Sequence, residues 1–371
     1  MRRQLLAGLA IGTAALLALS ACGDSNSETP AGGGSSAAAK GKVGVILPDT
    51  ASSARWEGND RPLLKAAFDA AGIESDIQNA DGDVAKFRTI ADGMISAGVK
   101  VLLIVNLDSD SAAAVVKKAE AAGIPTIDYD RLTLGGGSKY YVSFDNTAVG
   151  TAIGTGLVKC LEEDGKKPAD GGIVELNGAP TDNNATLFKA GYDKVIKEAG
   201  YSVVADQAVP EWDNTKAGTL FEQIDTAQKG KYIGVAAAND GLGGAVVARL
   251  KAQGLDGKIP VTGQDATDEG LQRVLLGTQC VTVYKAVKAE ADAASKLAIA
   301  LASGDTAAAD ALATGKTLDT KTNQQVPSVL LQPVGIYADN VKDVVADGFT
   351  TADKICTTTE LKKACTKYGV S

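Results

Sequence analysis

Short runs of apolar, often β-branched residues alternate with longer helical segments along most of the chain. The runs are continuous rather than alternating, which is typical of strands buried on both faces of a parallel sheet. We expect strands at residues 43–47, 75–78, 101–105, 126–129, 173–176, 203–205, 233–237, 261–263 and 281–284. A late strand is expected at 326–334, and the polar stretch 304–325 is expected to be a surface connection.

A repeated Ala-Gly-apolar signal separates many of these segments. Glycine at the end of a helix adopts the left-handed conformation, and the next apolar residue packs back on the helix. Gly72, Gly98, Gly123 and Gly200 have this setting. Strand–helix units occur in two series, before and after residues 144–146, and therefore predict an α/β protein of two lobes, each a doubly wound parallel sheet.

The N-terminus has the pattern of an export signal. Arg2 and Arg3 precede an apolar stretch, residues 5–19, that is short for a membrane span. Leu19-Ser20-Ala21-Cys22-Gly23 then resembles a bacterial lipobox, so we expect a lipoprotein signal peptide at 1–21 and acylation of Cys22. The alternative is a plain secretory signal with an incidental cysteine. Residues 22–40 are rich in Ser, Gly and Ala, and we expect a flexible tether there.

Four cysteines follow the tether: Cys160, Cys280, Cys356 and Cys365. An even number in an oxidising compartment favours two disulfides, although four cysteines allow three pairings. We prefer Cys356–Cys365 because it closes a short local loop, which leaves Cys160–Cys280 by elimination.

Composition excludes several classes of function. The 371 residues include no histidine, which removes Ser-His-Asp triads, Cys-His pairs and His-ligated metal sites. A formal net charge of −8 argues against a nucleic-acid-binding protein. The glycine-rich stretches 135–137 and 241–244 do not fit a nucleotide-binding loop, and no carboxylate spacing fits a calcium loop. We therefore expect no cofactor, no metal and no catalytic residue.

Polar residues follow nearly every expected strand, where ligands bind in open α/β sheets. They are carboxylates, amides, a lysine and a guanidinium, which make the paired hydrogen bonds that vicinal hydroxyls need. The set comprises Asp49, Asn106, Asp108, Asp130, Arg131, Asp182, Asn183, Asn184, Asn239, Asp240, Gln264, Asp265 and Lys285. Taken singly, such residues have ordinary explanations: Asp240 and Asp268 are expected helix N-caps, and Lys285 would be solvated.

The two tryptophans, Trp56 and Trp212, lie in loop-like segments of different series. A tryptophan is more often a packing residue than a ligand contact. One indole from each lobe would suit the apolar face of a pyranose, while polar groups bind its rim.

Several segments resemble, in order, the type I periplasmic sugar-binding proteins over residues 43–350. They are Arg55-Trp56, Tyr129-Asp130-Arg131, Ser143-Phe144-Asp145-Asn146, Asp182-Asn183-Asn184-Ala185, Asn239-Asp240, Gly263-Gln264-Asp265 and Gly277-Thr278-Gln279, with Val283-Tyr284-Lys285 following. The resemblance is strongest to members that bind D-xylose, although Asn106-Leu107-Asp108 and the tail after Ala352 depart from that pattern.

This resemblance implies two lobes joined by a three-segment hinge. The N-terminal lobe would comprise 41–145 and 286–324, and the C-terminal lobe 146–285 and 325–371, with crossings near Asn146, Lys285 and Gln325. It also implies ten ligand-binding residues: Arg55, Trp56, Asp130 and Arg131 from the N-terminal lobe, and Asp182, Asn184, Trp212, Asn239, Asp265 and Lys285 from the other lobe or the hinge.

The implied function is capture of a monosaccharide, D-xylose, and its delivery to the permease of an ABC importer. The protein would be a monomer held at the outer face of the cell membrane by its lipid alone. Two other hypotheses are a sugar sensor that presents its closed state to a membrane receptor, and a secreted carbohydrate-active enzyme. The acids are spread over strand ends rather than isolated as a pair, which disfavours the enzyme.

Overall fold

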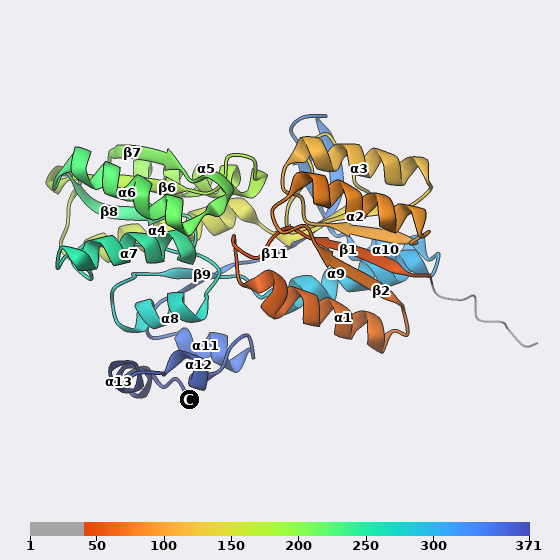
Figure 1. The fold of residues 1–371 in the computed structure, drawn as a ribbon. Helices are drawn as coiled ribbons and strands as arrows, with labels where there is room; N and C mark the ends of the chain where they lie inside the picture. Colours follow the sequence, from red (N-terminus) through yellow and green to blue (C-terminus); the bar gives the residue numbers. More distant parts are fainter. Residues whose placement is uncertain (1–40) are drawn as a thin grey trace, which may run out of the picture. The chain divides into compact units, whose positions relative to one another are not determined.

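A computed structural model describes residues 41–371 (Figure 1). The expected signal peptide, the tether and the acylation at Cys22 lie outside these residues. Within 41–371, none of the helices combines the length and the apolar character needed to cross a bilayer.

The first lobe is built on a seven-stranded sheet in the order β10-β11-β5-β4-β3-β1-β2. All neighbouring pairs are parallel except β10 and β11. The strands are β1 (Val43–Leu47), β2 (Ser75–Asn79), β3 (Val101–Ile104), β4 (Thr126–Tyr129), β5 (Tyr140–Phe144), β10 (Gly315–Asp319) and β11 (Gln324–Leu331).

Helices cover both faces of this sheet (Figure 1). They are the π-helix η1 (Trp56–Asp60), α1 (Arg61–Ala70), α2 (Val84–Ser96), α3 (Ser109–Ala121), α9 (Val287–Ala302) and α10 (Thr306–Leu312). Val43, Val45 and Leu47 of β1 pack in one core with side chains of α1 and α9. Ile46 packs in another core with side chains of α2 and α3. Burial on both faces explains why these strands are continuous apolar runs.

The second lobe is built on a parallel sheet in the order β7-β6-β8, with a separate antiparallel pair of β9 and β12. The strands are β6 (Gly172–Asn177), β7 (Val203–Ala208), β8 (Tyr232–Ala237), β9 (Thr282–Tyr284) and β12 (Val334–Ile336). Its helices are α4 (Asn146–Glu163), α5 (Asn183–Glu198), α6 (Asn214–Gln228), α7 (Asp240–Ala252) and α8 (Asp268–Leu275), with the 3-10 turns η2 (Pro168–Asp170) and η3 (Pro210–Trp212). The predicted fold of two α/β lobes with parallel sheets is confirmed.

Four expectations about individual segments were wrong. Residues 304–325 are not a plain surface connection, because they contain α10 and the edge strand β10. The aromatic strand β5 was not predicted, and residues 261–263 make only isolated bridges to Val235 and Val281. We placed everything from 325 onward in the second lobe, whereas β11 pairs with β5 of the first sheet. The chain therefore leaves the first sheet after Leu331.

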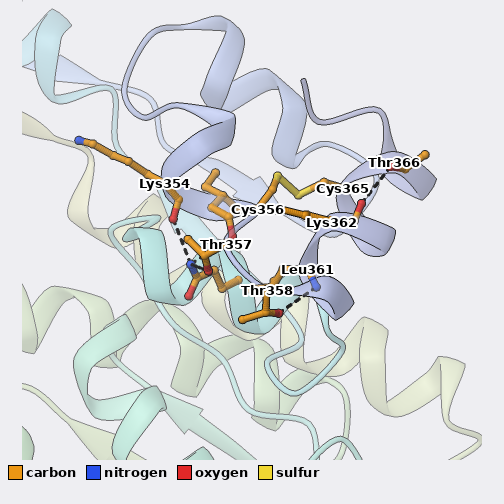
Figure 2. The surroundings of a disulfide bond; sticks show 10 residues. Lys354, Cys356, Thr357, Thr358, Leu361, Lys362, Cys365 and Thr366 are labelled. Carbon is orange, nitrogen blue, oxygen red and sulfur yellow. Dashed lines mark hydrogen bonds between the residues drawn. A yellow bond between two sulfur atoms is a disulfide. The ribbon is translucent and has the colours of Figure 1, made fainter.

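Both expected disulfides are present. Cys160–Cys280 joins the end of α4 to the segment before β9, and Cys356–Cys365 joins the end of α12 (Ala352–Ile355) to α13 (Thr359–Tyr368). Figure 2 shows the second bridge among the residues of this C-terminal extension. This extension comprises residues 341–371 and begins with α11 (Val341–Ala346). Its apolar side chains pack against α8 and Tyr284. Gln272 of α8 donates hydrogen bonds to the carbonyl oxygens of Lys354 and Ile355.

Glycines allow α4 and α5 to pack closely in the second lobe. A Cβ atom at Gly150 would lie 2.0 Å from the backbone oxygen of Phe188, so only glycine fits there. A Cβ atom added at Gly218 of α6 would have no other atom within 4 Å. The two positions therefore make a matched pair of helical glycines.

We expect Gly150→Ala to lower the free energy of unfolding by about 1–3 kcal/mol, because the added methyl forces the two helices apart. Gly218→Ala should instead raise it by about 0.5–1 kcal/mol, since alanine is the better helix former. Urea unfolding of both variants checks this. Equal effects at the two positions would contradict the close packing of α4 on α5.

Candidate ligand-binding site

One cavity is lined by residues of both lobes. Its lining comprises Ser52, Ser53, Arg55, Trp56, Asp130, Arg131, Asp182, Asn184, Phe188, Trp212, Asn239, Gln264, Asp265 and Lys285. All ten residues that the sequence singled out as candidate ligand contacts are in this set. The structure thus brings together side chains separated by up to 230 positions in the chain.

Strand ends explain why these residues meet. Asp130 and Arg131 directly follow β4, Lys285 follows β9, and Asn239 lies two residues beyond β8. The carboxyl ends of parallel strands open at one edge of each sheet, where ligands bind in such folds. Asn239 also caps α7, since its Oδ1 accepts the backbone N–H of Leu242 at 2.9 Å.

Asp130 lies at the centre of the site in a left-handed backbone conformation, with φ of 62°. Such a conformation costs on the order of 1–3 kcal/mol for a residue other than glycine. Its carbonyl oxygen accepts hydrogen bonds from Tyr141 Oη, Ser143 Oγ and Asn184 Nδ2 at 3.0, 2.7 and 3.0 Å. These bonds hold the strained turn, so its carboxylate stays directed toward its cationic partners.

Arg55 is buried among three carboxyl groups. Its Nε and Nη2 donate to the two oxygens of Asp60 at 2.9 and 2.7 Å, and Nη1 donates to Asp130 at 2.8 Å. Nη2 also donates to Glu290 at 2.5 Å. Asp60 and Glu290 are fully buried, and neither lines the cavity.

Lys285 and Arg131 make the other ion pairs of the cavity wall. Lys285 Nζ lies 3.3 Å from Asp265 and 3.6 Å from Asp130. Burial opposes the charge of Lys285, but Asp130 and Asp265 outweigh it and raise its pKa. Arg131 Nε lies 3.1 Å from Asp182. Lys285 is therefore buried and paired rather than solvated, and Asp130 and Arg131 are buried as well.

Asn106, Leu107 and Asp108 do not line the cavity. Asn106 nevertheless supports Arg131 by hydrogen bonds. Its Nδ2 donates to the backbone oxygen of Arg131, and Arg131 Nη1 donates to the backbone oxygen of Asn106, both at 3.0 Å. Leu107 and Asp108 line an adjoining outer groove, which shares Arg131, Asp182 and Trp212 with the cavity.

Both tryptophans line the cavity and are almost fully buried. Trp56 Nε1 donates to Ser52 Oγ and Trp212 Nε1 donates to Asp182, each at 3.1 Å. A Cβ atom at Gly178 would lie 2.1 Å from the Trp212 ring, so this glycine admits the indole. The guanidinium of Arg55 lies 4.5 Å from the centre of the Trp56 ring, a cation–π contact.

Four lining residues were not among the candidate ligand contacts: Ser52, Ser53, Phe188 and Gln264. Gln264 carried a usable signal, because it follows the expected strand 261–263 directly. It is buried, and its Oε1 has no hydrogen-bond partner within the described part of the chain. Ser52, Ser53 and Phe188 have no such signal, since serines in loops and a phenylalanine on a helix are common everywhere.

Two expected N-caps were wrong. Asn239 caps α7, and Thr267 caps α8 through a 3.0 Å bond to the N–H of Gly270. Asp240 is instead buried, and its carboxylate accepts from Thr282 Oγ1 and Gln279 Nε2 at 3.0 and 2.7 Å. Burial raises the pKa of Asp240 to about 6. Asp268 accepts a hydrogen bond from Thr350 Oγ1.

The lining residues carry three cations (Arg55, Arg131 and Lys285) and three carboxylates (Asp130, Asp182 and Asp265). Their formal charges cancel. Among residues 41–371, no group of three or more His, Cys, Asp or Glu side chains is placed to hold a metal ion. A neutral wall rich in donors and acceptors suits an uncharged polar molecule.

Two α/β lobes with a polar cavity between them define a class of protein that holds a small solute between its lobes. Residues 43–306 match the family described as "Periplasmic binding protein domain". The chain therefore belongs to the periplasmic binding protein family, and it has the type I fold of the family's sugar-binding members.

Two relatives match almost the whole described chain. The D-xylose-binding periplasmic protein of Escherichia coli K12 is 34% identical over 313 residues, covering 83% of this chain and 90% of that protein. The multiple sugar-binding periplasmic receptor of Rhizobium radiobacter is 32% identical over 342 residues, covering 86% and 93%. An ABC transporter solute-binding protein from Clostridium phytofermentans, solved with bound β-D-glucose, is 28% identical with a TM-score of 0.75, covering 85% and 99%.

Burial raises the pKa of Glu290 to about 8, and Asp130 and Asp60 add to the shift while Arg55 and Lys285 oppose it. The folded protein therefore holds this proton more tightly than the unfolded chain. The resulting stability is complete below the unfolded pKa, near 4.5, and is lost as pH rises toward 8.

We expect the free energy of unfolding to fall between pH 5 and 8 more steeply in the wild type than in Glu290→Gln. The difference should approach one proton, or about 1.4 kcal/mol per pH unit at most. Urea unfolding at several pH values measures both slopes. Other buried acids, such as Asp128 and Glu175, whose pKa values are also raised to about 7, should leave a residual slope in the variant. Parallel curves would contradict a protonated Glu290.

Proposed function

We propose that this chain binds a neutral monosaccharide, D-xylose or a close analogue, between its two lobes. The observation that carries the proposal is the cancellation of charge in the cavity wall, where three cations face three carboxylates. A sugar acid or sugar phosphate would bring an extra negative charge into a buried site with no unpaired cation to meet it. A neutral polyol needs only donors and acceptors.

Hydrogen-bonding capacity supports the same ligand class. Carboxylates accept from sugar hydroxyls, guanidinium and ammonium groups donate to them, and amides do both. Gln264 Oε1 and the second N–H of Asn239 Nδ2 have no partner in residues 41–371. Trp56, Trp212 and Phe188 add apolar surface suited to the face of a sugar ring.

Contacts between the lobes support a closing motion about the hinge. Ser53 Oγ donates to Asp265 at 3.3 Å, and Asn184 Nδ2 donates to Asp130 Oδ1 at 3.1 Å, each joining a residue of one lobe to a residue of the other. Asn239 Nδ2 donates to the backbone oxygen of Ser52 at 3.4 Å. We propose that sugar binds one lobe first and that such contacts hold the closed state.

We further propose that the closed protein delivers its sugar to the permease of an ABC importer. Export, acylation at Cys22 and anchoring at the outer face of the cell membrane are part of this proposal, with the protein acting as a monomer. The two disulfides suit an oxidising compartment outside the cytoplasm. The relative described as a receptor supports a second role, in which the closed state is presented to a membrane sensor.

A thermal-shift screen of the exported protein against pentoses, hexoses, a uronic acid and a sugar phosphate tests the ligand class. Neutral sugars should raise the melting temperature, D-xylose most, and the charged sugars should not. Chromatography should recover the bound sugar unchanged, because the chain is proposed to bind without turnover. A shift with the charged sugars alone, or a chemically altered sugar, would contradict the proposal.

We expect Arg131→Ala and Asp265→Ala each to weaken sugar binding at least tenfold, about 1.4 kcal/mol, while the chain stays folded. Arg131→Ala leaves the buried Asp182 without its counter-charge, and Asp265→Ala leaves Lys285 with only the more distant Asp130. A partner left without its interaction costs more than the bond itself contributes. Calorimetry checks the affinity. Arg249→Ala and Asp292→Ala, which alter surface ion pairs, are matched controls. Wild-type affinity in both site variants would place the sugar elsewhere.

A further inference from the structure

The environment of Arg55 points to a residue that acts on the ligand without touching it. A guanidinium has five N–H donors. In Arg55, Nε–H and one Nη2–H bind Asp60, the other Nη2–H binds Glu290, and one Nη1–H binds Asp130. One Nη1–H has no acceptor among the described residues, and Arg55 lines the cavity.

Glu290 lies behind this guanidinium. It is in the first turn of α9, five residues after Lys285, and its side chain is fully buried. Its Oε2 accepts from Arg55 Nη2 at 2.5 Å, whereas Asp130 accepts from Nη1. Glu290 does not line the cavity, so it has no contact through which to bind a sugar directly.

The two carboxyl groups on Nη2 define the plane of the guanidinium. Asp60 alone binds Nε and Nη2 side by side, and Tyr129 Oη fixes Asp60 by donating to it at 2.5 Å. Asp130, which itself lines the cavity, holds Nη1. Glu290 binds the remaining Nη2–H from outside the cavity, so it adds a restraint that involves no ligand-facing residue. The same orientation sets Arg55 against the Trp56 ring.

We propose that Glu290 is a positioning residue for sugar binding, which holds the guanidinium of Arg55 so that its unused Nη1–H faces the ligand. This inference rests on the proposed function. Without Glu290 only Asp60 and Asp130 would hold the guanidinium, and part of its ordering would take place during binding, which lowers the affinity.

The test compares substitutions that keep or remove the acceptor. Glu290→Met fills a similar volume without an acceptor, and we expect it to weaken binding of D-xylose about tenfold, or of D-glucose if only the hexose binds. Glu290→Gln keeps an oxygen for Nη2 and should restore affinity to within about threefold of the wild type. If the Met variant does not fold, Glu290→Asp, which withdraws the carboxylate by one methylene, serves in its place.

Glu175→Met is the matched control. Glu175 is also a fully buried carboxyl paired with a cation, Lys189, but it lies in the second lobe and outside the cavity. Its substitution should lower the melting temperature and leave sugar affinity within about twofold. Equal losses of affinity in the Glu175 and Glu290 variants would show a general effect of instability and overturn the proposal.

A double-mutant cycle distinguishes positioning from any other route. In an Arg55→Lys background the guanidinium fork is gone while the charge remains, so Glu290→Met should cost less than about threefold. A full tenfold loss in that background would show that Glu290 acts without Arg55 and would overturn the inference. If the wild type binds neither sugar, the proposed function fails first. If it binds and Glu290→Met binds equally well, only the positioning role fails.

Discussion

The structure depends on the pairing of buried charges between the two lobes. An unpaired ion in a protein interior is strongly destabilising, whereas a hydrogen-bonded pair is tolerated. Asp130 is the hub, because its carboxylate contacts Arg55 and Lys285, and its backbone oxygen accepts from Asn184 of the second lobe. The strained turn at this residue, the position of α9 and the meeting of the lobes all serve this arrangement.

Pairing also sets what the cavity can accept. Each cation of the wall already has a carboxylate partner, so a ligand gains no net Coulombic attraction and competes by hydrogen bonds and ring contacts. These interactions are directional, and they depend on groups held in place before binding. The carboxyl groups of Asp60 and Glu290 behind Arg55 supply that rigidity from outside the cavity. The wall and the shell behind it therefore have separate tasks: one contacts the ligand, and the other fixes the wall.

The sequence was informative wherever local pattern and topology agree. Continuous apolar runs located most strands, and the rule that ligands lie beyond strand ends brought Asp130, Asn239 and Lys285 into one set. Prediction from the sequence failed where contacts with residues distant in the chain determine the structure. Strand β10 alternates in polarity because it is an edge strand, so it resembles a loop. Glu290 lies in an alanine-rich helix that also carries Lys288 and Asp292, where a carboxylate resembles a solvated surface group. Only the approach of Arg55 from η1 gives it a role.

The most direct test of this account is a crystal structure of the protein grown with D-xylose or D-glucose. The account predicts one sugar between the lobes, with hydroxyl oxygens within hydrogen-bond distance of Arg131, Asp265 and the free Nη1–H of Arg55, and with the indoles of Trp56 and Trp212 against the ring. Sugar density on an outer surface, with the charged wall of the cavity unchanged and empty, would contradict it.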